Sequence, residues 1–451
     1  MTKVMLVNPG VGEQYSTQEP LNLGFLASFL EKYGIEVRIA DQIAGQNPKK
    51  EISKYNPDFV GITGTTPVIN DALRIGNWCM EHDFAVIFGG VHASVRPYDF
   101  NPPFTVVIGE GEKSLLDIAK GRVALGGIVE GSLVKDLDTI PPPARHLIDM
   151  DFYMRSKDRI PDSYLYFVPE HGKVASMLTS RGCPFECIFC WNSTRKTPVR
   201  MNSPLRVITE IEQLCREYRI DAIFFIEDNF FISKSRVRKI CEMILAKEIE
   251  IIWGANARVD GIDIGLLKLA RKAGCRQITF GFESGSQRIL NILNKRTTVE
   301  QNKRAIEICR EVGIIPQGTV MIGSPFETVK DIEMTAQFIR DTRIQDTVGI
   351  CITTPFPGTK LWDWCKERDL IPESFSWSDF NYREIPIPCC ESISPEELRD
   401  IYYRMVDEFS QGRKLKFEDE IRKAFQHPLI TLKKVWNNPF KLFRALKRMK
   451  S

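Results

Sequence analysis

The sequence predicts an α/β protein with two parallel-sheet domains followed by a mostly helical C-terminal region. Strand and helix patterns alternate over residues 3–131 and again from Val174 to about residue 364. The strand patterns are short and almost continuously apolar, as expected for parallel strands covered on both faces. Between the two runs lies TIPPPARHL, which can continue neither a helix nor a central strand.

The first run indicates a doubly wound, Rossmann-like domain over residues 1–140. KVMLVNP reads as a strand and LNLGFLASFLEKYG as an amphipathic helix that ends at Gly34; EVRIAD, DFVGIT, FAVIFGG and FTVVIGEG follow as strands. Such domains bind ligands at the carboxyl ends of their strands. The residues at or near those ends that we select as ligand-binding candidates are Asn8, Thr63, Gly89, Gly90, His92, Gly109 and Glu110.

The second run indicates a partial (β/α)6 barrel over residues 174–364, after a linker at residues 141–173. Its strand patterns are VASMLTSRG, DAIFFIED, IEIIWGANAR, CRQITFGFES, IPQGTVMIGSP and TVGICITTPF. Helical patterns lie near 205–217, 234–247, 263–273, 299–312 and 328–341. Right-handed crossovers would curl six such units into part of a barrel, with its chemistry at the C-terminal strand ends. A C-terminal region over residues 365–451 contains a helical pattern from Pro395 to Phe409.

The composition is that of a globular protein, with 43% hydrophobic and 26% charged residues. No apolar stretch is long enough for a spanning helix, and the N-terminus runs directly into a strand pattern, so we expect a cytoplasmic protein without a signal peptide. The formal net charge is only +3, but residues 411–451 hold twelve Lys or Arg against three Asp or Glu. A basic tail of this kind suggests a surface that meets phosphate groups.

One group of cysteines carries a spacing signal. In SRGCPFECIFCW, Cys183, Cys187 and Cys190 form a C-x3-C-x2-C pattern just after the first barrel strand. Three thiolates on one loop can hold three irons of a four-iron, four-sulfur cluster and leave the fourth iron open. Zinc in a structural site needs four ligands, and no fourth Cys or His follows at a usual spacing. The spacing therefore favours the cluster over zinc and over buried structural cysteines.

The cysteine motif and the strand-end motifs that follow it resemble the radical S-adenosylmethionine (SAM) superfamily over most of residues 174–364. The resemblance includes Phe189 before the last cysteine, IEDNFF, GANAR, GFESGS, GTVMIGSPFET and TPFPGTKLW. It implies that SAM binds the open iron and is cleaved reductively to a 5′-deoxyadenosyl radical.

The same resemblance assigns roles to individual residues around SAM. Glu227 or Asp228 would accept hydrogen bonds from the methionine amine, and Arg258 would meet the methionine carboxylate. Glu283 would face ribose and methionine, while Gly318 and Gly323 would let the backbone approach adenine. Taken singly, a Glu or Arg at a strand end is more often part of a structural ion pair.

The N-terminal motifs VNPG, GGVHAS and VIGEGE, placed before such a barrel, resemble the cobalamin-binding radical SAM enzymes. The resemblance then covers about residues 1–364 and implies a cobalamin at the strand ends of the first domain. No D-x-H-x-x-G pattern is present, so histidine ligation of cobalt is unsupported. His92 either lines the cofactor or is a histidine whose hydrogen bonds are satisfied by the backbone of a turn.

This resemblance implies a C-methyltransferase that acts on an unactivated carbon of a lipid, an isoprenoid or another secondary metabolite. An external electron donor of the flavodoxin or ferredoxin type would supply electrons. Radical ring closure, or another skeletal change without net methylation, is an alternative, and a non-catalytic cobalamin or metal sensor is a second. Methylthiolation is disfavoured because no second cysteine triplet exists.

The basic tail has its own pattern. Trp436, Phe440 and Phe443 stand among seven Lys or Arg, and Pro439 divides the segment. Aromatic residues opposite a basic face are typical of an interfacial membrane helix, which would place the protein peripherally on the inner face of a membrane. Packing of the tail on the barrel is the alternative. Nucleic-acid binding is not favoured, because no stacking platform or reading motif accompanies the charge.

Overall fold

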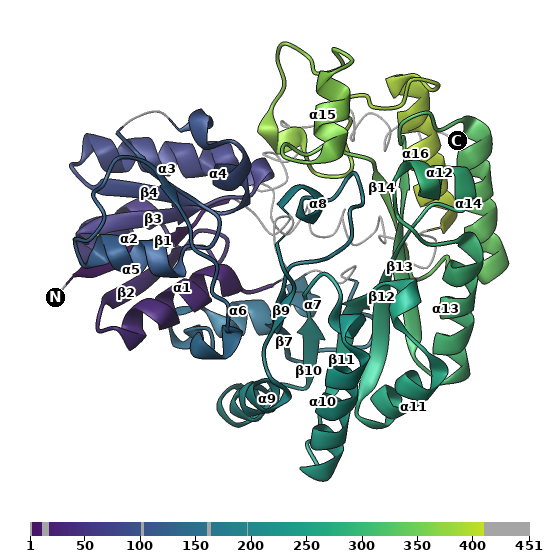
Figure 1. Ribbon diagram of the computed structural model, residues 1–451, viewed down its shortest axis with the longest axis horizontal. Helices are drawn as coiled ribbons and strands as arrows, with labels where there is room; N and C mark the ends of the chain where they lie inside the picture. Colours follow the sequence, from purple (N-terminus) through teal and green to yellow (C-terminus); the bar gives the residue numbers. More distant parts are fainter. Residues whose placement is uncertain (1, 11–17, 101–102, 160–163, 196, 410–451) are drawn as a thin grey trace, which may run out of the picture.

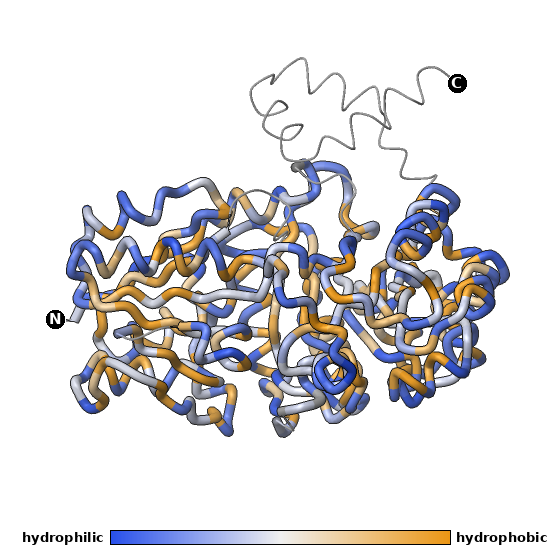
Figure 2. Tube along the Cα trace, turned by 90° about the horizontal axis from the view of Figure 1, so that it is seen from above, coloured by the Kyte–Doolittle hydropathy of each residue, from blue (hydrophilic) through white to orange (hydrophobic). Residues whose placement is uncertain are grey.

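The structure, a computed structural model, describes residues 2–10, 18–100, 103–159, 164–195 and 197–409. Two six-stranded parallel sheets lie side by side, the first in purple and blue and the second in teal and green in Figure 1. In Figure 2, apolar segments run through the interior of both parts. Within these ranges, no helix combines the length and hydrophobicity needed to cross a bilayer.

The first sheet has the strand order β2-β1-β3-β4-β5-β6. Its strands are β1 Lys3–Asn8, β2 Glu36–Asp41, β3 Phe59–Thr63, β4 Ala85–Gly89, β5 Thr105–Ile108 and β6 Gly127–Glu130. The first five confirm the predicted strands, whereas β6 was not predicted. The strand order reverses direction between β1 and β3, which creates a crevice at the carboxyl edge where doubly wound domains bind ligands.

Helices cover both faces of this sheet. They are α1 Leu21–Lys32, α2 Pro48–Tyr55, α3 Ile69–Glu81, α4 Val91–Val95 and α5 Glu112–Ala119. Successive β1 residues point to opposite faces, so Leu6 packs in the apolar cluster that contains α1 and α5, and Val7 in the cluster that contains α2 and α3. The predicted helix stop at Gly34 is confirmed, because this residue has a φ of 78° just beyond α1.

The second sheet has the order β14-β13-β12-β11-β10-β7, so that each strand pairs with the next one in this series. The strands are β7 Val174–Met177, β10 Ala222–Phe225, β11 Ile252–Ala257, β12 Cys275–Glu283, β13 Ile315–Ile322 and β14 Val348–Ile352. The sheet is open, with β7 and β14 at its edges. It confirms the predicted succession of six parallel βα units.

Five crossover helices follow the predicted ranges closely: α9 Pro204–Tyr218, α10 Lys234–Ala246, α11 Ile264–Lys272, α13 Val299–Glu311 and α14 Val329–Thr342. Each begins after a Ser, Thr or Asp whose side chain accepts a backbone N–H of the first turn. The short helix α12, Gln287–Ile292, was not predicted and has no side-chain cap.

The segment between the sheets, predicted as a linker, is packed against both. It contains α6 Met150–Met154 and α7 Ser156–Arg159. Tyr153 Oη donates a 2.7 Å hydrogen bond to Asp41 of the first sheet, and Arg145 Nη1 donates at 2.7 Å to Glu210 of α9. The segment therefore joins the two domains through buried polar contacts.

The C-terminal region returns to the domain junction. It comprises α15 Lys360–Lys366, the short 3-10 helix η8 Trp377–Asp379 and α16 Pro395–Phe409, which confirms the predicted helix. The centre of the Trp377 ring lies 5.0 Å from the centre of the His92 ring, in an edge-on arrangement. A Cβ at Gly358 would come within 2.4 Å of Val95 in α4, so the loop before α15 also packs tightly on the first domain. The basic tail lies outside the described residues.

Candidate active site

A short antiparallel pair forms the stem of the cysteine loop. Beyond the end of β7, β8 (Ser180–Arg181) pairs with β9 (Arg200–Met201). The chain between them carries the three cysteines and α8 (Asn192–Arg195). At the start of the loop Gly182 has a φ of 89°, and a Cβ there would lie 2.8 Å from the Pro198 carbonyl oxygen. The tight stem therefore requires glycine at this position.

The cysteine loop is held by backbone hydrogen bonds to two distant elements. Ile188 N donates to Leu293 O at 3.0 Å, and Ile188 O accepts from Leu361 N at 2.9 Å. Cys187 is buried, Cys183 and Cys190 are half-buried, and no cysteine in the described residues forms a disulfide. Phe189 packs in apolar clusters with side chains of β13 and α15.

No three His, Cys, Asp or Glu side chains converge on a single ion position within the described chain. In an iron–sulfur cubane each cysteine binds a different iron, so the three thiols need not converge on one ion position. Burial raises the pKa of Cys187, while the nearby Lys295 and Arg258 act to lower it. These two cations would offset the negative charge of a thiolate-bound cluster.

The β10 end places two carboxylates beside this loop. Glu227 is buried and accepts a 2.5 Å hydrogen bond from Thr179 Oγ1, but its Oε2 is buried without a partner among the described residues. Burial raises the pKa of Glu227 to about 7. Asp228 accepts a hydrogen bond from Asn192 of α8 and contributes to the electrostatic environment of Cys183 and Cys190. The unpaired oxygen of Glu227 is ready to accept a hydrogen bond from a ligand.

The ends of β11 and β12 contribute an arginine and a glutamate. The Arg258 guanidinium lies 3.5 Å from the centre of the Phe185 ring in the cysteine loop and donates to Asp260 at 2.9 and 3.0 Å. Glu283, with a φ of 61°, accepts a 2.7 Å hydrogen bond from the buried Lys295. Both predicted residues therefore lie near the loop, and each is engaged in an ion pair.

The two predicted glycines at β13 have a packing role. A Cβ at Gly318 would lie 2.3 Å from the Phe282 ring, and one at Gly323 would lie 2.5 Å from Leu398 of α16. Protein side chains occupy the space beside both residues, which is a different reason for glycine from the predicted approach of adenine.

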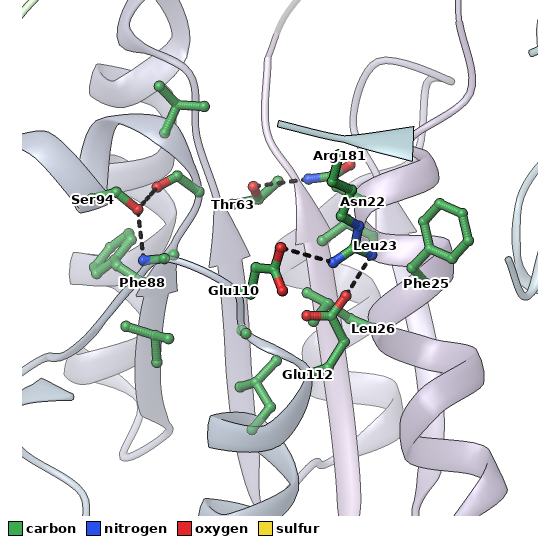
Figure 3. Close-up of a pocket in the computed structure, with 18 of the residues that line it drawn as sticks. Asn22, Leu23, Phe25, Leu26, Thr63, Phe88, Ser94, Glu110, Glu112 and Arg181 are labelled. Carbon is green, nitrogen blue, oxygen red and sulfur yellow. Dashed lines mark hydrogen bonds and ion pairs between the residues drawn. The ribbon is translucent and has the colours of Figure 1, made fainter. Parts of the chain in front are cut away.

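A cavity of about 370 Å³ lies at the carboxyl edge of the first sheet (Figure 3). Of the seven residues selected from the sequence, Thr63, Gly89, Gly90, Gly109 and Glu110 line it. The cysteine-loop side contributes further lining residues, including Arg181, Trp191, Asn192, Thr197 and Arg200. The cavity is therefore built by both domains.

Hydrogen bonds and glycines shape the cavity wall. Ser94 Oγ donates to Gly90 O at 2.7 Å and accepts from Gly109 N at 3.0 Å (Figure 3). A Cβ at Gly89 would meet no neighbouring protein atom nearer than 4.0 Å, so this glycine leaves room in the cavity. This wall fits a bulky ligand that approaches the backbone closely.

Asn8 and His92 are not among the residues that line the cavity. Asn8 Nδ2 donates to Asp41 at 2.9 Å. The His92 side chain is fully buried, with Nδ1 3.1 Å from Thr66 Oγ1 and Nε2 3.2 Å from Asp99 Oδ2. The ring nitrogens of His92 therefore find their partners in the side chains of Thr66 and Asp99, whereas the second alternative expected the backbone of a turn.

Comparison with known proteins agrees with this geometry. The family model of the radical SAM superfamily matches residues 177–339, and the B12-binding domain matches residues 8–119. A protein of Pyrococcus horikoshii named an uncharacterized methyltransferase is 32% identical over 388 residues, which cover 79% of this chain and 80% of the relative. The chain belongs to the cobalamin-binding radical SAM enzymes.

A second relative and a solved structure extend the comparison. The anaerobic magnesium-protoporphyrin IX monomethyl ester cyclase of Rubrivivax gelatinosus is 28% identical over 88% of this chain and 75% of its own length. The cobalamin-dependent SAM radical enzyme OxsB, solved with aqua-cobalamin and SAM, is similar over 92% of this chain and 62% of that longer chain, with a TM-score of 0.64 and 19% identity. The second similarity shows the shared fold.

The cofactors of this radical SAM enzyme are a four-iron, four-sulfur cluster, SAM and cobalamin. The residues present fit all three. The cysteine loop offers three free thiols, Glu227 offers a buried oxygen without a partner among the described residues, and the first domain offers a glycine-lined cavity. As in radical SAM enzymes generally, a reductant and a substrate are required.

Three residues around the site were not singled out from the sequence: Arg181, Arg200 and Lys295. Arg181 pairs with Glu112 and Arg200 with Glu110 in the cavity wall, and Lys295 pairs with Glu283. Arg181 stands two residues before the first cysteine, which is the one signal along the chain that would have singled it out.

Proposed function

We propose that this enzyme is a C-methyltransferase that acts on an unactivated carbon. The observation that carries the proposal is the cavity formed jointly by strand ends of the first domain and by Trp191, Asn192 and Thr197 at the cysteine loop. A ligand in this cavity would lie against the loop that holds the cluster. A methyl donor and a radical source must both reach one substrate carbon, and a shared site provides that proximity.

The chain's own residues have distinct parts in this proposal. Cys183, Cys187 and Cys190 hold the cluster, and Glu227 accepts a hydrogen bond from the methionine amine. When bound, the cluster supplies the electron that cleaves SAM, and cobalamin supplies the methyl group. In this proposal, the apolar packing around Phe189 and the contact of Trp377 with His92 would limit the access of water to the junction.

Radical ring closure is the second candidate function. Two anaerobic magnesium-protoporphyrin IX monomethyl ester cyclases, 28% and 29% identical, each match 88% of the chain. Cyclases and methyltransferases of this family need the same cluster, so the substrate contacts decide between them. The mass of the product separates the two, because methylation adds a carbon and ring closure removes hydrogens.

The first experiment is anaerobic reconstitution followed by reduction in the presence of SAM. Wild-type protein should bind about four irons and release 5′-deoxyadenosine, and it should take up cobalamin. Cys187→Ala should lose the cluster absorbance and SAM cleavage, whereas Cys215→Ala, a change of a half-buried cysteine on α9, should keep both. Intact SAM after reduction of the wild type would refute the enzyme proposal and favour a non-catalytic sensor.

The partners belong to the same proposal. A flavodoxin or ferredoxin would serve as reductant, and the substrate would be a lipid, an isoprenoid or another secondary metabolite. The basic tail, which lies outside the described residues, would hold the enzyme on a membrane surface where such a substrate resides. Support for this comes from the spacing of aromatic and basic residues in the tail.

A further inference from the structure

Two arginines at the stem of the cysteine loop reach into the first domain. Arg181 and Arg200 stand opposite each other in the β8–β9 pair. Arg200 donates to both carboxylate oxygens of Glu110, at 2.6 and 2.9 Å. Arg181 donates to Glu112 at 2.7 Å and lies 3.5 Å from Glu110. Both ends of the cysteine loop are therefore tied to the segment that follows β5.

These ion pairs are largely shielded from water. The exposed fraction of the side chain is 8% for Arg200, 4% for Glu112, 15% for Glu110 and 18% for Arg181. Ion pairs in such surroundings are screened by salt much less than pairs on the surface. Glu110 also accepts from Val134 N at 2.9 Å, and Arg200 also donates to Val134 O at 2.6 Å. The contacts therefore hold Glu110 in one orientation.

The charge of Glu110 is maintained in this setting. Burial alone would raise its pKa, but hydrogen bonds from Arg200 and Val134 N, together with the positive charges of Arg181 and Arg200, lower it below the ordinary value. Glu110 is therefore ionised at neutral pH and pairs with a guanidinium on each strand of the stem.

The same four side chains line the cavity of the first domain. Figure 3 shows Arg181 between Glu110 and Glu112, beside the apolar residues of α1. A ligand in the cavity would thus contact the residues that fix the base of the cysteine loop. The sequence assigned Glu110 to cofactor binding, yet both of its oxygens bind protein donors.

We infer that Glu110 is a positioning residue that sets the distance and orientation of the cysteine loop relative to the ligand in the first-domain cavity. The inference rests on the proposed function, because it takes cobalamin as that ligand. It predicts that cobalamin binding and cluster placement depend on each other through Glu110.

Glu110→Gln tests this inference, with Asp331→Asn as the matched control. Asp331 is also a carboxylate with a largely buried side chain that pairs with an arginine, Arg288, but the pair lies within the second domain and does not line the cavity. Two quantities are measured on the full chain. Absorbance titration gives the dissociation constant of aqua-cobalamin, and pulsed electron paramagnetic resonance gives the distance distribution between cob(II)alamin and the reduced cluster.

For Glu110→Gln we expect normal iron content, a broadened distance distribution and a dissociation constant raised by about fivefold or more, the lower range of coupling between linked sites. Asp331→Asn should match the wild type in both measurements. Should Glu110→Gln fail to fold, Arg200→Gln is measured against the same outcomes.

The inference would be overturned if Glu110→Gln gave wild-type values for both quantities, or if Asp331→Asn showed losses equal to those of Glu110→Gln. If the wild type itself takes up no cobalamin, the proposed function fails and the inference fails with it. If the wild type takes up cobalamin but Glu110→Gln has the same dissociation constant and distance distribution, only the positioning role is refuted.

Discussion

Replacing Arg145 by methionine should destabilise the junction of the two domains. Arg145 Nη1 donates to Glu210 at 2.7 Å and Nη2 to Ser176 O at 2.8 Å, and Nε lies 3.7 Å from Glu19. All three contacts are buried. Removing one partner of a buried ion pair costs about 3–5 kcal/mol, because the remaining charge stays uncompensated. We therefore expect the free energy of unfolding of Arg145→Met to fall by about this amount.

The loss of unfolding free energy in Arg145→Met should depend on pH, because Glu19 titrates. Burial raises the pKa of Glu19, whereas Arg145 lowers it, so the pKa should rise further in the variant. When the pH is above 4.5, the ordinary pKa of a glutamate, the unfolded chain releases the Glu19 proton, whereas the folded variant would keep it. A state that releases protons on unfolding loses stability as the pH rises. The difference from the wild type should therefore be smaller at low pH and larger at high pH.

Urea denaturation at a mildly acidic and a mildly alkaline pH, followed by tryptophan fluorescence of the metal-free protein, measures this difference. Glu19→Gln combined with Arg145→Met should recover part of the loss at the higher pH, because no buried charge remains at residue 19. The reasoning is refuted if Arg145→Met has the same free energy of unfolding as the wild type. It is also refuted if the double variant is no more stable than Arg145→Met at the higher pH.

The remaining predictions concern the site, the barrel and the tail. Glu227→Gln should weaken SAM binding in equilibrium dialysis by about tenfold or more, because a hydrogen bond to a charged group contributes about 1.5–3 kcal/mol; unchanged affinity would contradict the role of this carboxylate. Gly318→Ala would place a Cβ 2.3 Å from the Phe282 ring, so the free energy of unfolding should fall by about 1–3 kcal/mol in urea titrations, and a neutral result would show that the ring can move. A chain without residues 426–451 should lose most of its sedimentation with anionic liposomes, which for the full chain should weaken at high salt; equal sedimentation would favour packing of the tail on the barrel.

Much of the fold was predictable because local signals agree with the tertiary structure. The crossover helices carry Ser, Thr or Asp caps and an apolar stripe, so their limits were visible along the chain. The strand β6 was missed because GIVE is a mostly exposed edge strand with little apolar pattern. The helix α12 was missed because six residues without a side-chain cap give little periodic signal.

The site was predictable where its residues are close in sequence or belong to a motif at the end of a strand. The cysteines share one loop, and their spacing is itself the signal. Arg200 lies 90 residues from its partner Glu110, and Lys295 lies 12 residues from Glu283, in the loop after α12. No periodicity links such pairs, since tertiary folding alone brings them together. For the same reason, the protein-facing packing of Gly318 could not be distinguished from approach by a ligand.

The contact between Trp377 and His92 bears on the order in which the protein is completed during synthesis. Each strand of the second sheet pairs with the strand made before it in the series, so these units can assemble as they leave the ribosome. The first sheet likewise needs only the first third of the chain. A nascent chain that has not yet reached Trp377 lacks this part of the junction, even if both of its sheets have already formed. This part of the junction is consequently finished late, whereas the contacts of Arg145 and Tyr153 between the domains can form as soon as α9 has been made.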